Sequence, residues 1–320
     1  MALSGAPLRV PAGEQAAALP ALSAQTRLCV VAPHPDDETI ACGLLIQQVL
    51  AAGGEVEIWL LTAGDNNPWP QRWLERRLRI DQAGRQRWGS RRQQEMRLAM
   101  QRLGLPPAAL RELGWPDLGV TDLLLRDGAA TAASLTAALR RFAPTMVAMP
   151  ALEDRHPDHA AAHVLMRLAL RPLPQLPAWT YLVHGPVRPS GVALAGSAAQ
   201  LERKLQALEA HRSQLALSGR RMRRLAMRPE CYSLSAAVGE PSTALPWRPH
   251  AWLQARLRLS VVDASGAASH WWWKEAPLRL DRDGTSHLPR AATADGPRFA
   301  RLQRQLPTPW IFDHWGWREL

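Results

Sequence analysis

A cluster of ionisable side chains follows an apolar run near the start of the chain. The run covers residues 28–32, and His34, Asp36, Asp37 and Glu38 follow it within six residues. Groups of this kind are costly to bury unless solvent, a counter-charge or a metal ion compensates them. Imidazole and carboxylate groups are ligands of zinc, and a carboxylate can also accept a proton from water. The cluster therefore has the residue types of a metal-dependent hydrolytic site.

A second cluster of the same composition lies more than a hundred residues later. Residues 153–159 read Glu-Asp-Arg-His-Pro-Asp-His and follow an apolar run that ends at Pro150. One histidine and one aspartate from the first cluster, with a histidine from the second, would give the three protein ligands of a catalytic zinc site. The remaining carboxylate and imidazole would supply the base and the acid that hydrolysis needs. On chemistry alone, Asp36 and Asp37 are interchangeable as ligand and base.

The elements that precede the two clusters must bring them together. Apolar runs alternate with segments of helical spacing, the runs at 28–32, 56–61, 145–149 and 179–183 and the helical segments at 40–52, 92–103, 132–142 and 158–170. This alternation predicts an α/β fold, with a Rossmann-like, mostly parallel sheet and helices on both faces. Ligands of such sheets bind beyond the carboxyl ends of the strands. Both clusters are therefore expected in one crevice.

Two segments depart from the alternation. Residues 65–90 are polar and rich in Arg and Trp, and long loops of this kind usually have a function. We interpret them as a lid or rim over the site; the alternative is an insertion with a short surface helix. After about residue 235 short alternating runs and turn signals predict a β-rich extension. The expected organisation is an N-terminal extension, an α/β domain and a β-rich extension, at 1–24, 25–235 and 236–320.

Composition argues against several classes of protein. The net charge is +11, but nearly all the basic residues are scattered arginines, so we expect no specific nucleic-acid partner. Three cysteines without a C-x-x-C pair do not suggest a disulfide framework. We find neither a signal peptide nor a run of 18 apolar residues, and we therefore predict a cytoplasmic protein with no transmembrane segment. No pattern indicates an oligomeric state.

The two clusters together carry a family resemblance. Pro-His-Pro-Asp-Asp-Glu at 33–38, after a hydrophobic strand, and His-Pro-Asp-His at 156–159 resemble the PIG-L/LmbE family of zinc-dependent de-N-acetylases, which act on conjugates of N-acetylglucosamine. Further segments that resemble the family pattern are Arg92-x-x-Glu95, residues 113–117 and residues 204–214. The resemblance spans roughly residues 28–215, and the 65–90 and C-terminal segments fall outside it.

The resemblance also implies roles for single residues. The ligands that it implies for one zinc ion, with iron(II) as the alternative metal, are His34, Asp37 and His159. It implies that Asp36 is the general base, and that His156, oriented by Asp158, polarises or protonates the scissile amide. The candidates for substrate contact or for support of the loops are Arg92, Asp117 and His184.

The function that follows is hydrolysis of an N-acetylated sugar conjugate to acetate and a free amine. One alternative is an amidase for a larger acyl group, because nothing in the motif measures the acyl pocket. Another is a glycan- or polyanion-binding protein that keeps the scaffold without turnover. Asp36 favours the enzyme, because a protein that only binds has no need of a base beside three ligands.

Other conspicuous residues are expected to have structural roles. We expect Glu38 to anchor the first loop and His211 to pack within a helix. His163 follows His159 by one helical turn but lacks the glutamate of an H-E-x-x-H motif, so it is not expected to bind metal. The aromatic segment 310–317 is expected to dock against the body of the protein. Of Trp271 to Trp273, at least one is expected in the core, because neighbours in a strand face opposite sides.

Overall fold

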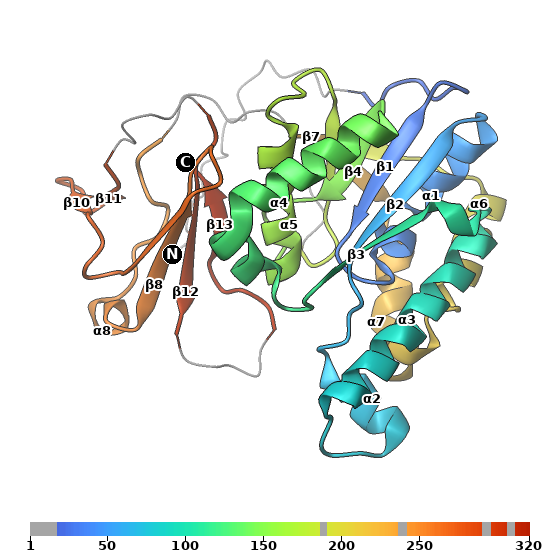
Figure 1. Ribbon diagram of the computed structural model, residues 1–320, viewed down its shortest axis with the longest axis horizontal. Helices are drawn as coiled ribbons and strands as arrows, with labels where there is room; N and C mark the ends of the chain where they lie inside the picture. The colour runs from blue at the N-terminus through green and yellow to red at the C-terminus, as the bar shows by residue number, and fades with distance from the viewer. Residues whose placement is uncertain (1–17, 186–190, 236–241, 290–295, 306–310) are drawn as a thin grey trace, which may run out of the picture.

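The structure, a computed structural model, describes residues 18–185, 191–235, 242–289, 296–305 and 311–320. Most of the predicted N-terminal extension lies outside these ranges. A seven-stranded sheet with the order β3-β2-β1-β4-β5-β7-β6 forms the centre of the main domain (Figure 1). Its strands are β1 (Arg27–Ala32), β2 (Glu55–Thr62), β3 (Leu110–Trp115), β4 (Met146–Pro150), β5 (Ala178–Tyr181), β6 (Val192–Leu194) and β7 (Glu230–Leu234). Strands β1 to β5 pair in parallel with one another, and β7 pairs antiparallel with both β5 and β6.

Helices cover both faces of this sheet, which confirms the predicted fold class. The helices of the main domain are α1 (Asp37–Ala51), α2 (Pro68–Glu75), α3 (Gln82–Leu103), α4 (Val120–Phe142), α5 (Pro157–Leu170), α6 (Ala198–Leu208) and α7 (Arg212–Ala226), and all but α2 cover the sheet. A 3-10 turn, η1 (Pro107–Ala109), precedes β3. None of the helices in the described ranges has the length and hydropathy needed to span a bilayer.

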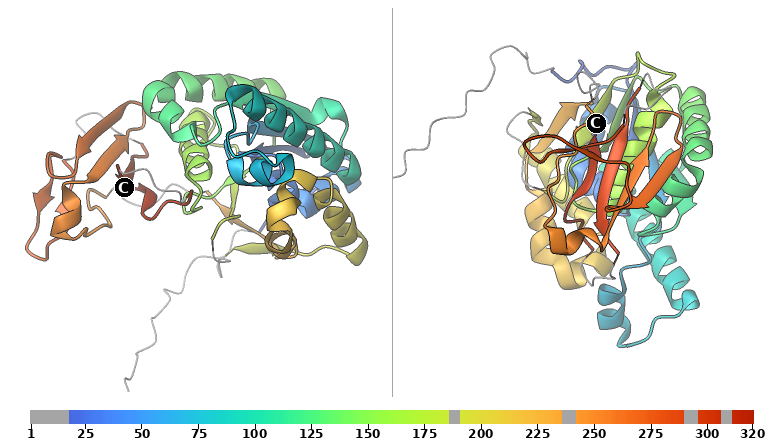
Figure 2. Two further views of the ribbon diagram at one scale, coloured as in Figure 1. Left: turned by 90° about the horizontal axis from the view of Figure 1, so that it is seen from below. Right: turned by 90° about the vertical axis from the view of Figure 1, so that its left-hand side faces the viewer.

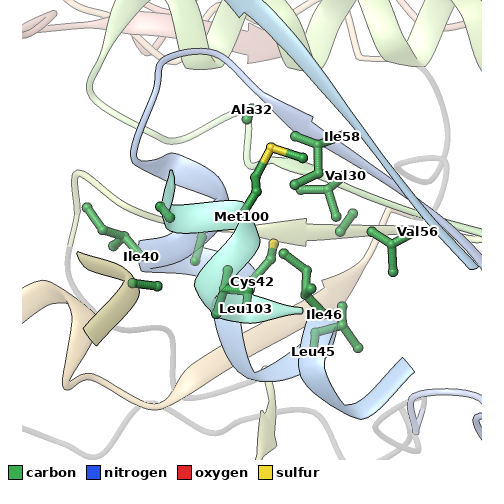
Figure 3. Close-up of a cluster of buried hydrophobic side chains, with 14 of the residues drawn as sticks. Val30, Ala32, Ile40, Cys42, Leu45, Ile46, Val56, Ile58, Met100 and Leu103 are labelled. Atoms are coloured by element: carbon green, nitrogen blue, oxygen red, sulfur yellow. The ribbon is translucent and has the colours of Figure 1, made fainter. Parts of the chain in front are cut away.

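The alternation of side chains along β1 explains why the sheet has a core on each of its two faces. Leu28, Val30 and Ala32 face a core built with α1, α3, α6 and α7, part of which Figure 3 shows. Cys29 and Val31 face the opposite core, built with α4 and α5. Because successive side chains of a strand point to opposite faces, a wholly apolar β1 is what a strand covered on both sides requires.

The segment 65–90 is mainly helical and is not the long loop that we expected. Pro68 begins α2, and Asn67 caps it by accepting a hydrogen bond from the Trp69 N–H. Asp81 then accepts the Gly84 N–H at 2.7 Å and starts α3 ten residues before the predicted helix at 92–103. The structure therefore favours the alternative of an insertion with a short surface helix.

The C-terminal part is β-rich, as predicted. A four-stranded antiparallel sheet has the order β13-β12-β8-β9, and its strands are β8 (Leu257–Val262), β9 (Ala268–Trp272), β12 (Phe299–Arg304) and β13 (Gly316–Glu319). A short helix and a two-stranded ribbon accompany it, α8 (Ala251–Gln254), β10 (Arg279–Leu280) and β11 (Ser286–His287). Val262, Phe299 and Trp317 join the core of α4 and α5, so this sheet packs on those helices (Figure 2). Trp273 is buried and Trp272 is exposed, as the alternation predicts.

A buried ion pair connects α6, β7 and α1. Lys204 Nζ lies 2.6 Å from Glu230 Oε1, and neither side chain reaches solvent. The Glu230 carboxylate also accepts the backbone N–H groups of Leu44 and Leu45 in α1. Removal of one partner of a buried ion pair leaves an uncompensated charge in the core. The destabilisation that this charge causes is larger than the net stabilisation that the intact pair provides.

We therefore expect Lys204→Met to lower the free energy of unfolding by about 3–5 kcal/mol. The neighbouring Arg203 is exposed, and we expect Arg203→Met to change the free energy by about 0.5 kcal/mol or less. Urea unfolding of the two variants measures the difference. Equal stabilities would show that Glu230 does not depend on Lys204.

Candidate active site

The two clusters meet where β1 and β4 end. These strands are hydrogen-bonded neighbours in parallel register, with Leu28 opposite Met146. The turn after β1 carries His34 and leads into α1, which begins at Asp37. The loop after β4 leads into α5, with His156 at its N-cap. Parallel pairing thus brings together residues that are more than a hundred positions apart in the chain.

Three of these side chains form a small triangle of ligand atoms. His34 Nδ1 lies 3.4 Å from Asp37 Oδ2 and 3.3 Å from His159 Nε2. His159 Nε2 lies 3.1 Å from the same oxygen of Asp37. All three side chains are buried. A tetrahedral zinc ion with bonds of about 2.0–2.1 Å separates its ligand atoms by about 3.3 Å, so the triangle has the dimensions of a zinc site.

The other ring nitrogen of His34, Nε2, lies close to two further carboxylate oxygens, and the three side chains form a second group of possible ligands. His34 Nε2 lies 3.2 Å from Asp117 Oδ1 and 3.3 Å from Asp158 Oδ2. Both carboxylates already accept backbone N–H groups, Asp117 from Asn66 and Asp158 from Leu118. They are thus suited to accept the Nε2 proton, which leaves Nδ1 as the metal-facing nitrogen. This arrangement favours the triangle of His34, Asp37 and His159 as the metal site over the second group of His34, Asp117 and Asp158.

Asp154 supports the ring of His159 as Asp117 and Asp158 support the ring of His34. We did not predict this role from the sequence. Its Oδ2 lies 3.2 Å from His159 Nδ1 and also accepts the N–H groups of Val183 and His184 at 3.0 Å. Burial alone would lower the pKa of His159, but the carboxylates of Asp154 and Asp37 raise that pKa to about 10. A carboxylate behind a ligating histidine fixes the ring and raises its basicity. The donors of both rings therefore fit a metal ion.

We expect Asp154→Asn to weaken zinc binding by about 10–100-fold, because the amide cannot supply the charge behind His159. Competition with a chromogenic chelator measures this affinity. The adjacent Glu153 is exposed, so Glu153→Gln is the matched control and should leave the affinity unchanged. Equal affinities in the two variants would contradict the role of Asp154.

The contact between His156 and Asp158 differs from the one that we expected. We predicted that the Asp158 carboxylate orients His156. Instead, His156 Nδ1 accepts the backbone N–H of Asp158 at 3.3 Å, as an N-cap does, while the carboxylate points to Leu118, Val120 and His34. Helix capping therefore positions the His156 ring. Burial and the neighbouring histidines lower the pKa of His156 well below its usual value.

Asp36 is held in an unusual backbone conformation. Its φ is 135°, a region that L-residues rarely occupy and that costs about 1–3 kcal/mol. Arg92 donates to Asp36 Oδ2 at 3.1 Å, to the Pro35 carbonyl and to the Gly64 carbonyl, and the Asp36 N–H donates to Glu38. Burial raises the pKa of Asp36 to about 6, against the opposing charge of Arg92. A strained, partly buried carboxylate beside the triangle is typical of a functional group.

The strain at position 36 has a measurable consequence. Asp36→Gly and Asp36→Ala both lose the carboxylate, but only glycine adopts a φ of 135° without strain. We expect the glycine variant to be more stable than the alanine variant by about 1 kcal/mol, the reverse of their order at ordinary positions. Thermal unfolding of the pair measures this. A more stable alanine variant would show that the loop relaxes around the substitution.

A pocket of about 190 Å³ opens onto these groups. Its walls include His34, Asp36, Asp37, Arg92, Asp117, His156 and His184, together with Asn67 before α2 and five residues of α7, Gln214, Ser218, Arg221, Met222 and Leu225. Seven of the nine site residues predicted from the sequence thus line one cavity. The other two, Asp158 and His159, are fully buried and contact His34, which lines it.

The C-terminal segment, which we expected to dock against the body, also reaches this pocket. Ile311 and Phe312 line the cavity. The Phe312 ring lies 5.3 Å from His184 and 6.2 Å from His156, and the Arg221 guanidinium lies 5.5 Å from the Phe312 ring. No local pattern indicates this contact, because it joins residues far apart in the sequence. Trp310, at the start of that segment, lies outside the described residues.

Two further histidines take different places. His163 Nδ1 lies 2.9 Å from the Pro150 carbonyl and outside the triangle, consistent with its expected structural role. His211 Nε2 lies 3.3 Å from Glu38 Oε1, at the base of the first loop. His211 therefore supports the loop that carries Asp36 through Glu38, beyond the helix packing that we expected.

The fold and the site together define an α/β protein with a His/Asp centre that fits a metal ion at the carboxyl edge of its sheet. Residues 29–170 match the profile of the PIG-L family, described as GlcNAc-PI de-N-acetylase. This confirms the resemblance that the sequence motifs carry.

Individual proteins show the same similarity. A 1D-myo-inositol 2-acetamido-2-deoxy-alpha-D-glucopyranoside deacetylase of Mycolicibacterium vanbaalenii is 32% identical over 154 residues, which cover 43% of this chain and 51% of the relative. The chain thus spans about half the length of the curated relatives that it matches. A deacetylase triple mutant of the teicoplanin biosynthetic pathway has the same fold, with a TM-score of 0.52 and 21% identity over 65% of this chain and 97% of that one. An N,N'-diacetylchitobiose deacetylase from Pyrococcus horikoshii gives a TM-score of 0.51 and 20% identity over 65% and 83%.

Proposed function

We propose that this protein is a metal-dependent hydrolase that removes the N-acetyl group from a conjugate of an N-acetylglucosamine-type sugar. The products are acetate and the free amine. The observation that carries the proposal is the triangle of His34, Asp37 and His159 with the Asp36 carboxylate beside it at the wall of the same pocket. The PIG-L match and the deacetylase names of the relatives support the same reaction.

We propose zinc as the metal, one ion per chain, held by His34, Asp37 and His159. Two imidazole nitrogens and one carboxylate oxygen are the donor set of catalytic zinc sites, and iron(II) accepts the same donors. When bound, such an ion lowers the pKa of water and polarises a carbonyl oxygen. The carboxylates of Asp117, Asp158 and Asp154 hold the two ligating rings in place.

The chain itself supplies the proton transfers. Asp36 takes a proton from the attacking water and passes it to the departing amine. Its hydrogen bond from Arg92 fixes the carboxylate at the pocket wall. His156, whose ring is fixed by the helix cap, lies where it can donate a hydrogen bond to the oxygen that becomes negative in the transition state.

Three candidates for substrate contact separate into two kinds. The Arg92 guanidinium already donates hydrogen bonds to three acceptors, in the loops after β1 and β2. The Asp117 carboxylate already contacts the Asn66 N–H and the His34 ring. We propose that these two support the loops. His184 lies at the pocket wall with its Nδ1 3.0 Å from Arg221, and we propose that it contacts the sugar.

Acetate release from zinc-loaded protein tests the proposal. The substrates are N-acetylglucosamine, N,N'-diacetylchitobiose and N-acetylglucosaminyl inositol, beside N-butyryl and N-hexanoyl glucosamine derivatives. Faster release of acetate than of the longer acids would support a deacetylase, and the reverse order would favour an amidase for larger acyl groups. Saturable binding of the sugars without release of any acid would mean a binding protein on the same scaffold.

A further inference from the structure

Helix α2 and the turn that follows it expose an unusual group of apolar side chains. Trp69, Trp73, Leu74 and Leu78 are 56%, 66%, 39% and 88% exposed. They lie within ten residues of one another, and the two tryptophans share a helix face because they are one turn apart. Figure 1 shows α2 at the lower end of the molecule, beyond the sheet. Single exposed apolar residues are ordinary, but four large ones within one short segment indicate a surface for interaction. We refer to these four residues as the α2 patch.

The α2 patch lies among positive charges. Residues 68–91 hold seven arginines against Glu75 and Asp81, a net charge of +5. Arg76, Arg77 and Arg79 are exposed between or beside the apolar side chains. The Arg72 guanidinium lies 5.0 Å from the Trp69 ring. Tryptophan, leucine and arginine together are the composition of a segment that lies in the interface of an anionic bilayer.

The buried side of α2 packs against the protein and so fixes the position of the helix that carries the α2 patch. Pro70 and Gln71 are buried, and Gln71 donates to the Gly84 carbonyl at 2.7 Å. Trp88, in the next helix, is also buried. The outward tryptophans are therefore presented by an ordered helix. They do not line the pocket, so the proposed hydrolysis gives them no role.

We propose that the α2 patch docks the protein on an anionic lipid surface. The indole rings and leucines would enter the headgroup region, and the arginines would bind lipid phosphates. A nucleic acid would use the arginines but would leave Leu74 and Leu78 in water, which makes it the poorer partner. Asn67, directly before α2, lines the pocket. The α2 patch therefore begins two residues after a residue of the pocket wall, and, resting on the proposed function, this suits a sugar conjugate carried on a lipid.

Vesicle flotation of the full chain tests the docking. The vesicles are phosphatidylcholine alone and phosphatidylcholine mixed with phosphatidylglycerol. We expect binding to the mixed vesicles, weakened about tenfold or more in Trp69→Ser/Trp73→Ser and in a second variant, Leu74→Ser/Leu78→Ser. Neutralisation of Arg76, Arg77 or Arg79 to glutamine should weaken it about fivefold for each residue.

A matched control comes from the C-terminal part. Trp252 is 70% exposed and lies in α8, away from α2. We expect Trp252→Ser to bind the mixed vesicles as the unaltered protein does. All the variants should keep their activity on a water-soluble substrate, so loss of docking is distinguished from failure of the proposed reaction. The proposal would be overturned by no binding to the mixed vesicles, by patch variants that both bind as tightly as the unaltered protein, or by retention on duplex DNA in place of vesicles.

Discussion

Asp36→Asn is expected to lower kcat for deacetylation by about a hundredfold to ten-thousandfold, the usual contribution of a general base. Asparagine has the shape of aspartate and keeps an oxygen acceptor for Arg92, which holds position 36 at 3.1 Å. It cannot take a proton from water. Metal content and the free energy of unfolding should therefore stay close to those of the unaltered protein while turnover is lost.

Steady-state rates of acetate release, with metal content measured on the same samples, check this expectation. Asp122, exposed on α4, provides the control, and Asp122→Asn should leave kcat unchanged. An Asp36→Asn variant that keeps its metal and more than about a tenth of its kcat would remove Asp36 as the base. Asp37 would then be the next residue to test for that role.

Removal of the metal has the second large expected effect. Dialysis against a chelator should reduce acetate release to background, because the attacking water then loses its activation. Addition of one equivalent of zinc should restore it. In His159→Ala, where the triangle loses its innermost nitrogen, zinc should not restore the rate. Full activity in the chelated protein, verified as metal-free, would exclude metal-dependent hydrolysis.

The sequence predicted the parallel core and the position of the two clusters because local patterns determine both. An apolar run covered on two faces indicates a buried parallel strand, and the ends of such strands meet at one edge. His34, Asp37 and His159 therefore come together as expected from the order of strands and helices.

Other features depend on contacts that no local pattern records. Phe312 reaches the pocket only because the C-terminal sheet packs on α4 and α5. The carboxylate of Asp158 faces the loop after β3, so its neighbours could not be read from the His-Pro-Asp-His motif. Helix α2, which we had offered only as the alternative for this segment, is a different case, because it is short and its apolar side chains Trp69 and Trp73 face outward instead of into a core.

The most direct test of the central claim is the metal content of the purified protein beside two histidine variants on α5. His159 is in the triangle, whereas His163, one turn later, bonds to the Pro150 carbonyl. We predict about one zinc per chain in the unaltered protein and in His163→Asn, and none in His159→Ala. Equal zinc in both variants, or no zinc in the unaltered protein after zinc is supplied, would contradict a metal centre formed by His34, Asp37 and His159.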